Sequence, residues 1–135
     1  MISVRRFLLF LFLVGEGTLS AQSLTSSNLP IIVIDTDGQT IVDDPKITAH
    51  MGVIYNGAGN RNSINDPFNN FNGNIGIELR GNVTQTFDKK SYRLELRDAT
   101  GGDLKVGLLG IPADADWVLI ASYIDKTFVR DPMVI

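Results

Sequence analysis

The sequence predicts a mixed α+β domain, made mainly of antiparallel strands after an amino-terminal leader, with a helix that starts near residue 125. Two observations predict the strands. Apolar residues alternate with polar ones at a period of two, and turn-forming residues separate these segments at short intervals. A third observation argues against a parallel sheet, which needs crossover helices. Residues 41–124 contain no segment with a clear helical period of 3.6 residues.

Residues 1–21 have the three parts of a secretory signal peptide. Arg5 and Arg6 form a positive start, residues 7–14 are an apolar core, and small residues lead up to Ala21. The apolar core falls far short of the roughly 20 residues that span a bilayer, so we expect no stable membrane span after cleavage. The sequence therefore predicts a secreted, extracytoplasmic protein, located in the periplasm or at the cell surface.

The charge and composition of the chain limit its partners. Removing the leader takes away Arg5, Arg6 and Glu16, so that the 12 basic and 15 acidic residues become 10 and 14, a net charge of −4. A mildly acidic chain is not typical of a protein that binds nucleic acid. The sequence has no cysteine, so a hydrophobic core has to stabilise the single domain that its length allows.

Five segments have the pattern of strands. Residues 22–29 form a short polar linker, and the apolar strand at residues 31–36 ends in the turn Asp37-Gly38. Ile41-Val42 is expected to be a short return strand. Residues 56–74 contain eight asparagines and three glycines, which predicts a long loop. The other strands are expected at residues 47–55, 75–80, 91–98 and 117–121.

The last part of the chain combines a core strand with the start of a helix. Trp117 begins an apolar segment and is expected to pack in the core. Asp125 is expected to cap the helix, because its side-chain oxygen can accept from free amide groups. Since the chain stops at Ile135, soon after that start, we expect the sequence to be a truncated domain.

The most informative segment, residues 77–96, predicts two strands joined by a polar connection. Gly81 ends the first strand, and Lys89 and Lys90 open the second. Two mobile cations beside a loop rich in Ser, Thr and Gln suit a phosphate-bearing ligand. An ordinary solvated strand end explains the same residues, because lysine is almost never buried.

Four patterns follow one another in a fixed order. They are a strand that ends in Asp35, the RG…KKSY hairpin from Arg80, the LLG-P-DW segment from Leu108, and a Y-x-DKT-x-x-R helix start at Tyr123. In this order they resemble the amino-terminal part of the CotH family, the spore-coat-protein-H-like secreted kinases. The resemblance implies that residues 30–135 are the incomplete amino-terminal part of an atypical kinase-like fold.

The resemblance implies a protein kinase that transfers the γ-phosphate of ATP to Ser or Thr of extracytoplasmic or cell-surface proteins, with Mg²⁺ or a similar divalent cation. Arg80, Lys89 and Lys90 match the family's hairpin pattern, and together with Gln85 they are the suggested nucleotide-binding residues. Asp88 stands where proline is common in the family, and its charge opposes phosphate binding. The family's catalytic and metal-binding aspartates lie beyond residue 135, so the chain as given is expected to hold no catalytic or metal site and to be inactive alone.

Two other classes of function are open. A non-catalytic surface, adhesion or carbohydrate-binding module would use the asparagine-rich loop. A haloacid-dehalogenase-like phosphatase would use Asp35 as nucleophile and Asp37 as general acid, although Gln39 interrupts the motif of that family. The lone His50 and the aspartates lack the spacing of zinc or EF-hand ligands, and turn formation explains the aspartates better.

Overall fold

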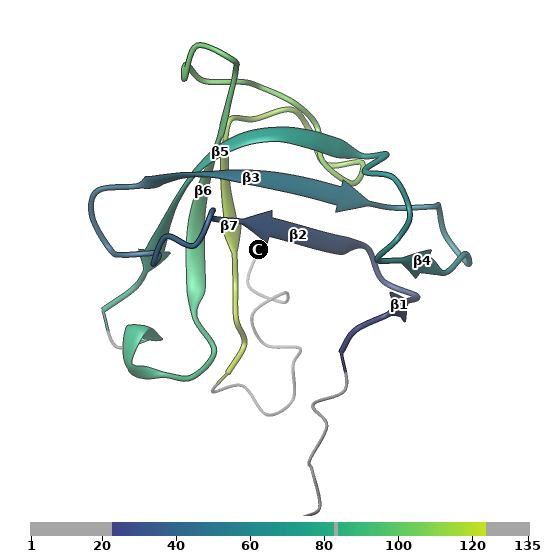
Figure 1. Ribbon diagram of the computed structural model, residues 1–135, viewed down its shortest axis with the longest axis horizontal. Coiled ribbons are helices and arrows are strands. Elements are labelled where there is room, and N and C mark those ends of the chain that lie inside the picture. Colours follow the sequence, from purple (N-terminus) through teal and green to yellow (C-terminus); the bar gives the residue numbers. More distant parts are fainter. Residues whose placement is uncertain (1–22, 83, 124–135) are drawn as a thin grey trace, which may run out of the picture.

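The computed structural model describes residues 23–82 and 84–123 of the chain. Within them a five-stranded antiparallel sheet has the order β2-β3-β5-β6-β7 (Figure 1). Its strands are β2 (Ile31–Asp35), β3 (Ile47–Ile54), β5 (Phe71–Arg80), β6 (Ser91–Arg97) and β7 (Asp116–Leu119). Two short strands, β1 (Ser26–Ser27) and β4 (Asn62–Ser63), pair with each other, and η1 (Thr84–Thr86) is a single 3₁₀ turn.

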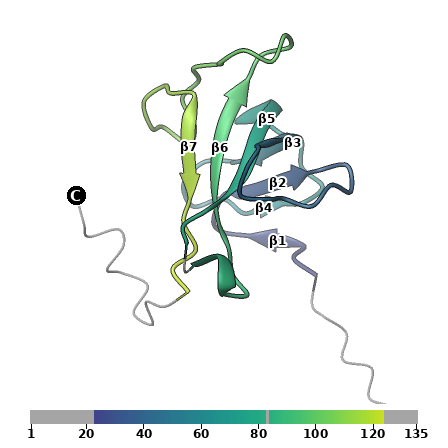
Figure 2. The ribbon, with the colours of Figure 1, turned by 90° about the vertical axis from the view of Figure 1, so that its left-hand side faces the viewer.

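The sheet bends strongly, so that β6 and β7 run across the direction of β2 and β3 (Figures 1 and 2). The long strand β5 belongs to both halves: residues 71–77 pair with β3, and residues 74–80 pair with β6. Gly73 and Gly76 lie in this strand, and glycine often marks a tight bend where a sheet turns a corner. The β5–β6 hairpin therefore projects away from the half of the sheet formed by β2 and β3.

One face of the sheet carries the hydrophobic core. Ile75 lies opposite Leu96, and Ile77 lies opposite Leu94, and these four side chains are almost completely buried. Full burial of each such side chain contributes about 1.5–3 kcal/mol to folding. The core cluster also contains Ala49, Met51, Val53, Phe71 and Leu108.

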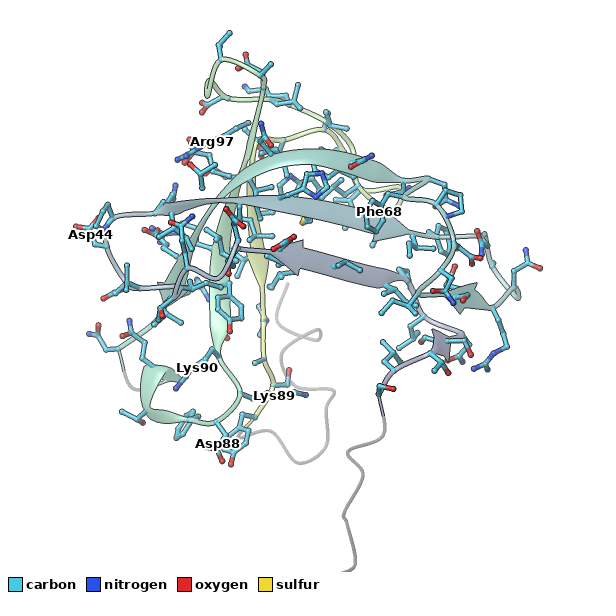
Figure 3. The ribbon with its side chains drawn as sticks, in the orientation of Figure 1. Asp44, Phe68, Asp88, Lys89, Lys90 and Arg97 are labelled. Carbon is cyan, nitrogen blue, oxygen red and sulfur yellow. The ribbon has the colours of Figure 1, made fainter. Side chains whose placement is uncertain are left out.

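The opposite face of the sheet is mostly polar. The pairing places His50 of β3 opposite Asn74 of β5, which in turn lies opposite Arg97 of β6. Two glycines let long side chains lie close to the backbone here. A Cβ atom on Gly76 would meet the guanidinium of Arg97 at 2.5 Å, and one on Gly52 would overlap the ring of Phe68. Figure 3 shows both side chains over the sheet.

The prediction of a mainly antiparallel β-structure is confirmed, with shifted strand ends. The largest shift is in β5, which begins at Phe71 and not at residue 75. The loop expected at residues 56–74 thus loses its last four residues to β5, and it also contains the short strand β4. Its many asparagines hid these elements, because asparagine is depleted in strands.

The short return strand expected at Ile41-Val42 is wrong. The antiparallel partner of β2 is β3, and the carbonyl of Val42 accepts a hydrogen bond from the backbone N–H of Leu79 at 2.8 Å. The turn itself is confirmed, since Asp37 and Gly38 have φ angles of 52° and 74°. The hydrogen bond to Leu79 connects the segment after the turn to β5, although the segment is not a strand.

Several predictions concern residues near the two ends of the chain. Trp117 packs against the core as predicted, and its Nε1 donates to the carbonyl of Asp114 at 3.0 Å. The segment expected to be a linker contributes β1, which pairs with β4. The leader and the helix expected near Asp125 lie outside the described residues, so the α+β class and the kinase-like fold stay predictions. Between residues 23 and 123, leaving out residue 83, no helix has the length and apolarity of a membrane span.

Candidate nucleotide-binding hairpin

The connection between β5 and β6 contains ten residues, 81–90, and carries most of the residues predicted to bind nucleotide. The last pair of the hairpin is Arg80 with Ser91. Gly81 follows with a φ angle of 87°, a conformation that side chains disfavour and glycine adopts readily. Figure 3 shows Lys89 and Lys90 at this end of the molecule, with their side chains on different sides of the chain. The sharp turn at Gly81 therefore opens a loop, shaped by η1, that ends in two lysines.

The two lysines differ in their surroundings. The ammonium of Lys90 is half-buried and donates to the backbone carbonyl of Gln85, with Nζ 2.5 Å from the oxygen. This bond closes the loop from the inside. Lys89 is exposed, and its ammonium has no partner among the residues that the structure describes. Of the two, Lys89 is thus the one whose charge is available to a ligand without breaking a bond of the fold.

The base of the hairpin is held by the segment that follows β7. The hydroxyl oxygen of buried Ser91 accepts from the backbone N–H of Ala121 at 3.0 Å. The rings of Phe87 and Tyr123 stack, with centroids 5.3 Å apart and planes inclined by 25°. An aromatic pair of this kind contributes about 0.5–1.5 kcal/mol beyond the area that it buries. These two contacts limit the positions that the loop can adopt relative to the sheet.

Other basic side chains of the sheet are paired with carboxylates. Lys46 lies 2.6 Å from Glu95, Arg97 lies 3.6 Å from the same carboxylate, and Arg93 lies 3.1 Å from Glu78. The hydrogen bond from Lys46 is the main cause that lowers the pKa of Glu95, and the charges of Lys46 and Arg97 add to it against the effect of burial. These pairs reduce the attraction of the three cations for a phosphate.

The structure places the four predicted site residues at the two ends and in the middle of one loop. Arg80 is exposed at the end of β5, Gln85 lies in η1, and Lys89 and Lys90 precede β6. Only Gln85 and Lys90 are brought into direct contact by a bond given above, and that bond uses the backbone of Gln85. Their role in nucleotide binding stays a prediction.

The two contacts that hold the hairpin against the segment after β7 could not be predicted from the sequence. Phe87 and Ser91 were visible as members of the hairpin, but their partners Tyr123 and Ala121 lie on the far side of β7. No local pattern connects residues that are 30 or more positions apart. The alternating Arg93, Glu95 and Arg97 did give a signal, because charges two residues apart on a strand share a face.

The phosphatase alternative is wrong. Asp35 and Asp37 lie in a turn between antiparallel strands, where Oδ1 of Asp35 accepts from the backbone N–H of Asp37 at 2.9 Å. That fold would need a helix and a parallel strand after this turn, but β3 follows and pairs antiparallel with β2. Across the described ranges, no group of three His, Cys, Asp or Glu side chains is arranged to hold a metal ion.

The fold and the hairpin thus define an antiparallel β-sheet domain with a basic, anchored connection between two of its strands. Residues 77–135 of this chain match the family model CotH, described as CotH kinase protein. Over these residues the chain is similar to the CotH family, and the predicted resemblance to the amino-terminal part of that family is confirmed there. The matched segment includes the β5–β6 connection, all of β6 and all four predicted site residues. No curated protein and no solved structure matches the chain.

Proposed function

We propose that this chain is the amino-terminal part of a secreted CotH-like protein kinase, and that its β5–β6 connection contacts the phosphates of ATP. The observation that carries the proposal is the exposed ammonium of Lys89, next to a loop that Lys90 closes and that lies inside the segment matching the CotH model. Because the backbone of the hairpin is anchored, binding through Lys89 has to order mainly the lysine side chain and not the whole loop.

Phosphoryl transfer requires mainly positioning of the nucleotide and neutralisation of its charge. In this proposal Lys89 supplies charge, and the loop of residues 81–90 supplies backbone N–H groups. Arg80 lies at the other end of the same connection, where its guanidinium can contribute a second cation. The reaction proposed is transfer of the γ-phosphate to Ser or Thr of extracytoplasmic proteins.

The proposal assigns the divalent cation and the catalysis to residues outside the described sheet. Mg²⁺ prefers carboxylate oxygens and phosphates as ligands, and the described part of the chain offers no cluster of three such groups. In this proposal the catalytic aspartates lie beyond residue 135, as the resemblance to the family implies. We therefore expect the 135-residue chain to bind an ATP analogue weakly and to transfer no phosphate.

The test is the affinity of the chain for a non-hydrolysable ATP analogue, measured by calorimetry for the parent and for Lys89→Ala/Lys90→Ala. Hydrogen bonds to charged groups are worth about 1.5–3 kcal/mol each, and exposure reduces this, so the double variant should bind about 10-fold to 100-fold more weakly. Lys105→Ala is the matched control, because Lys105 is exposed and lies in the connection at the other end of β6. Lys46 is unsuitable, since it pairs with Glu95.

Equal affinity in the parent, the double variant and Lys105→Ala would reject the hairpin as the nucleotide contact. The stability of the parent and of the double variant has to be measured as well, because Lys90 also bonds within the loop and its replacement is expected to lower stability. A loss of affinity that exceeds any loss of folded protein supports the proposal.

A further inference from the structure

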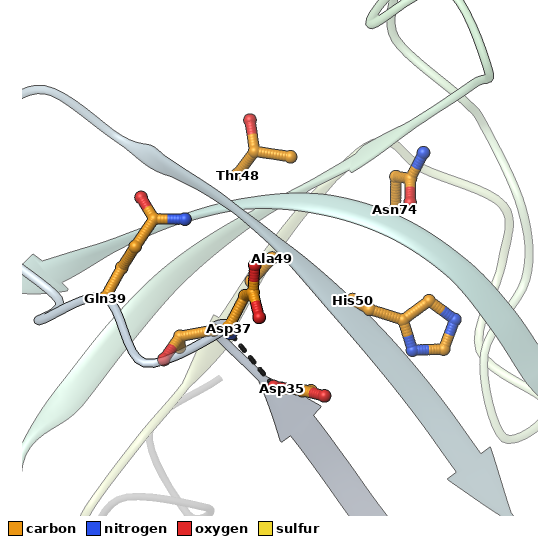
Figure 4. Close-up of a pocket in the computed structure, with 8 residues that line it drawn as sticks. Asp35, Asp37, Gln39, Thr48, Ala49, His50 and Asn74 are labelled. Carbon is orange, nitrogen blue, oxygen red and sulfur yellow. Dashed lines mark hydrogen bonds between the residues drawn. The ribbon is translucent and has the colours of Figure 1, made fainter.

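A pocket of about 310 Å³ lies on the polar face of the sheet, at the end of β2 and beside the turn that follows it. Its polar side chains are those of Asp35, Thr36, Asp37, Gln39, Thr48, His50 and Asn74, of which Figure 4 labels all but Thr36. None of these residues belongs to the β5–β6 connection, so this pocket is separate from the candidate nucleotide contact.

Residues on three neighbouring strands line the pocket, because they lie opposite one another across the sheet. Asp35 of β2 lies opposite His50 of β3, and His50 lies opposite Asn74 of β5. Because facing residues of neighbouring strands have Cβ atoms about 4.5–5.5 Å apart, their side chains form a closely spaced row. Figure 4 shows His50 and Asn74 on neighbouring strands at one side of the pocket, and Gln39 on the turn at the other side.

Much of the hydrogen-bonding capacity in this pocket is unused by the fold. The side chains of Gln39, His50 and Asn74 have no hydrogen-bond partner within the described part of the chain. Thr48 receives only a long bond of 3.5 Å from Arg97. An amide, an imidazole and a hydroxyl each both donate and accept hydrogen bonds. Such groups match a ligand that carries several hydroxyl groups.

The charges around the pocket restrict the ligand further. No Lys or Arg lines it, and the carboxylates of Asp35 and Asp37 repel anions. A phosphate or a nucleotide is therefore a poor fit. The part of the chain that the structure covers also has no cluster of three potential metal ligands. A neutral, hydroxyl-rich molecule satisfies these conditions, because carboxylates accept hydrogen bonds from hydroxyl groups.

An aromatic ring lies next to the polar row. The ring centroids of His50 and Phe68 are 6.2 Å apart with planes inclined by 45°, and Phe68 is 36 % exposed. The ring lies over Gly52, where any side chain would displace it. An exposed aromatic ring beside hydrogen-bonding groups can pack against the apolar face of a sugar, while the polar groups bind the sugar's hydroxyl groups.

We propose that this pocket binds a neutral carbohydrate. Gln39, Thr48, His50 and Asn74 bind its hydroxyl groups, and Phe68 packs against a neighbouring sugar unit. The site is at the rim of the sheet, and its lining is exposed apart from buried Ala49 and half-buried Thr36 and His50, so a polysaccharide chain can extend beyond the pocket. This inference does not depend on the nucleotide contact proposed above.

The experiment follows backbone amide signals of the labelled 135-residue chain by NMR during titration with cellotriose, maltotriose, mannotriose and chitotriose. We expect saturable shifts in residues 48, 50 and 74 with at least one of these trisaccharides. Gln39→Ala and Asn74→Ala should each weaken binding about 3-fold to 10-fold, the effect of one neutral hydrogen bond. Asn65→Ala, which removes an exposed asparagine outside the pocket, should leave affinity unchanged.

Absence of saturable shifts with all four trisaccharides would overturn the proposal. So would binding that Gln39→Ala and Asn74→Ala both leave unchanged, because the ligand would then lie elsewhere. Two further titrations, with an arginine-rich peptide and with calcium chloride, test the acidic side chains of the pocket. Shifts at residues 48, 50 and 74 with either of these, and none with a trisaccharide, would replace the carbohydrate by a cationic ligand.

Discussion

Two connections of the sheet are both rich in polar residues, but they use them in opposite ways. The connection between β3 and β5, residues 55–70, contains six asparagines, most of which bond within the connection. The connection between β5 and β6, residues 81–90, exposes Lys89 and bonds internally through Lys90. Polar composition alone therefore does not distinguish a loop whose polar side chains bond mainly within the loop from one that leaves a charged side chain exposed.

The asparagine-rich connection is organised around Asn56. Its side-chain Nδ2 donates to the carbonyl of Arg61 at 3.0 Å and to Oδ2 of Asp66 at 2.8 Å. Its Oδ1 accepts from Nδ2 of Asn69 at 2.8 Å, and its backbone N–H donates to Oδ1 of Asn62 at 2.7 Å. Side chains that hold the backbone in this way are not available to a partner. The structure thus gives these asparagines a role in folding, which weakens the expectation that this loop is an adhesive surface.

The largest effect on this contrast between the two connections is expected from replacing Asn62, the fully buried asparagine of the β3–β5 connection. Its side chain accepts from the N–H of Asn56 and donates to the carbonyl of Leu29 at 2.8 Å. We expect Asn62→Ala to lower the free energy of unfolding by roughly 2–3 kcal/mol, because two polar backbone groups lose their partner. Chemical denaturation monitored by Trp117 fluorescence measures this.

Asn65→Ala is the matched control for that variant. Asn65 lies in the same loop and is exposed, and its side chain makes no bond within the described residues. Its replacement should change stability by less than about 0.5 kcal/mol. If both variants have the stability of the parent, the loop is not held together by its asparagines and the contrast with the hairpin fails.

The second prediction is that two neighbouring lysines of the hairpin have different roles, one in stability and one in binding. Lys90→Ala removes the bond to the carbonyl of Gln85 and should lower the free energy of unfolding by about 1 kcal/mol. Lys89→Ala should leave stability within about 0.5 kcal/mol of the parent, because the side chain is exposed. Under the function proposed above, Lys89→Ala weakens binding of the ATP analogue. Parallel denaturation and calorimetry separate the two roles, and equal destabilisation by both variants would contradict the division.

Sequence patterns located the elements whose residues alternate clearly. In β6, Leu94 and Leu96 alternate with Arg93, Glu95 and Arg97, so both the strand and its two faces were predictable. The start of β5 was missed, because the run Asn72-Gly73-Asn74 separates Phe71 from Ile75 and conceals the apolar period.

Contacts between distant residues could not be predicted. Lys46 and Glu95 are 49 positions apart and meet only because of the register between β3, β5 and β6. The same reason applies to the pocket, since Asp35, His50 and Asn74 become neighbours only when three strands have paired. For the hairpin, the sequence identified Lys89 and Lys90 but gave no reason to treat them differently.

The smallest expected effect concerns the pH dependence of the asparagine-rich loop. Oδ2 of Asp66 accepts from the backbone N–H of Ser63 and from Nδ2 of Asn56, both at 2.8 Å. The bond from Ser63 is the largest cause that lowers the pKa of Asp66, followed by the bond from Asn56. A pKa below that of the unfolded chain means that the ionised carboxylate adds stability above about pH 4, and that this contribution disappears as the pH falls through the folded-state pKa.

Asp66→Asn removes this ionisation and should therefore make the stability of the protein less dependent on pH between about pH 5 and pH 2. Urea denaturation of the parent and the variant across that range measures the difference. Glu95 and Asp98 also have lowered pKa values, but they are present in both proteins, so the difference between the two curves reports on Asp66. Parallel curves would mean that the carboxylate of Asp66 is not held by the loop, which would remove one of the bonds that distinguish this connection from the hairpin.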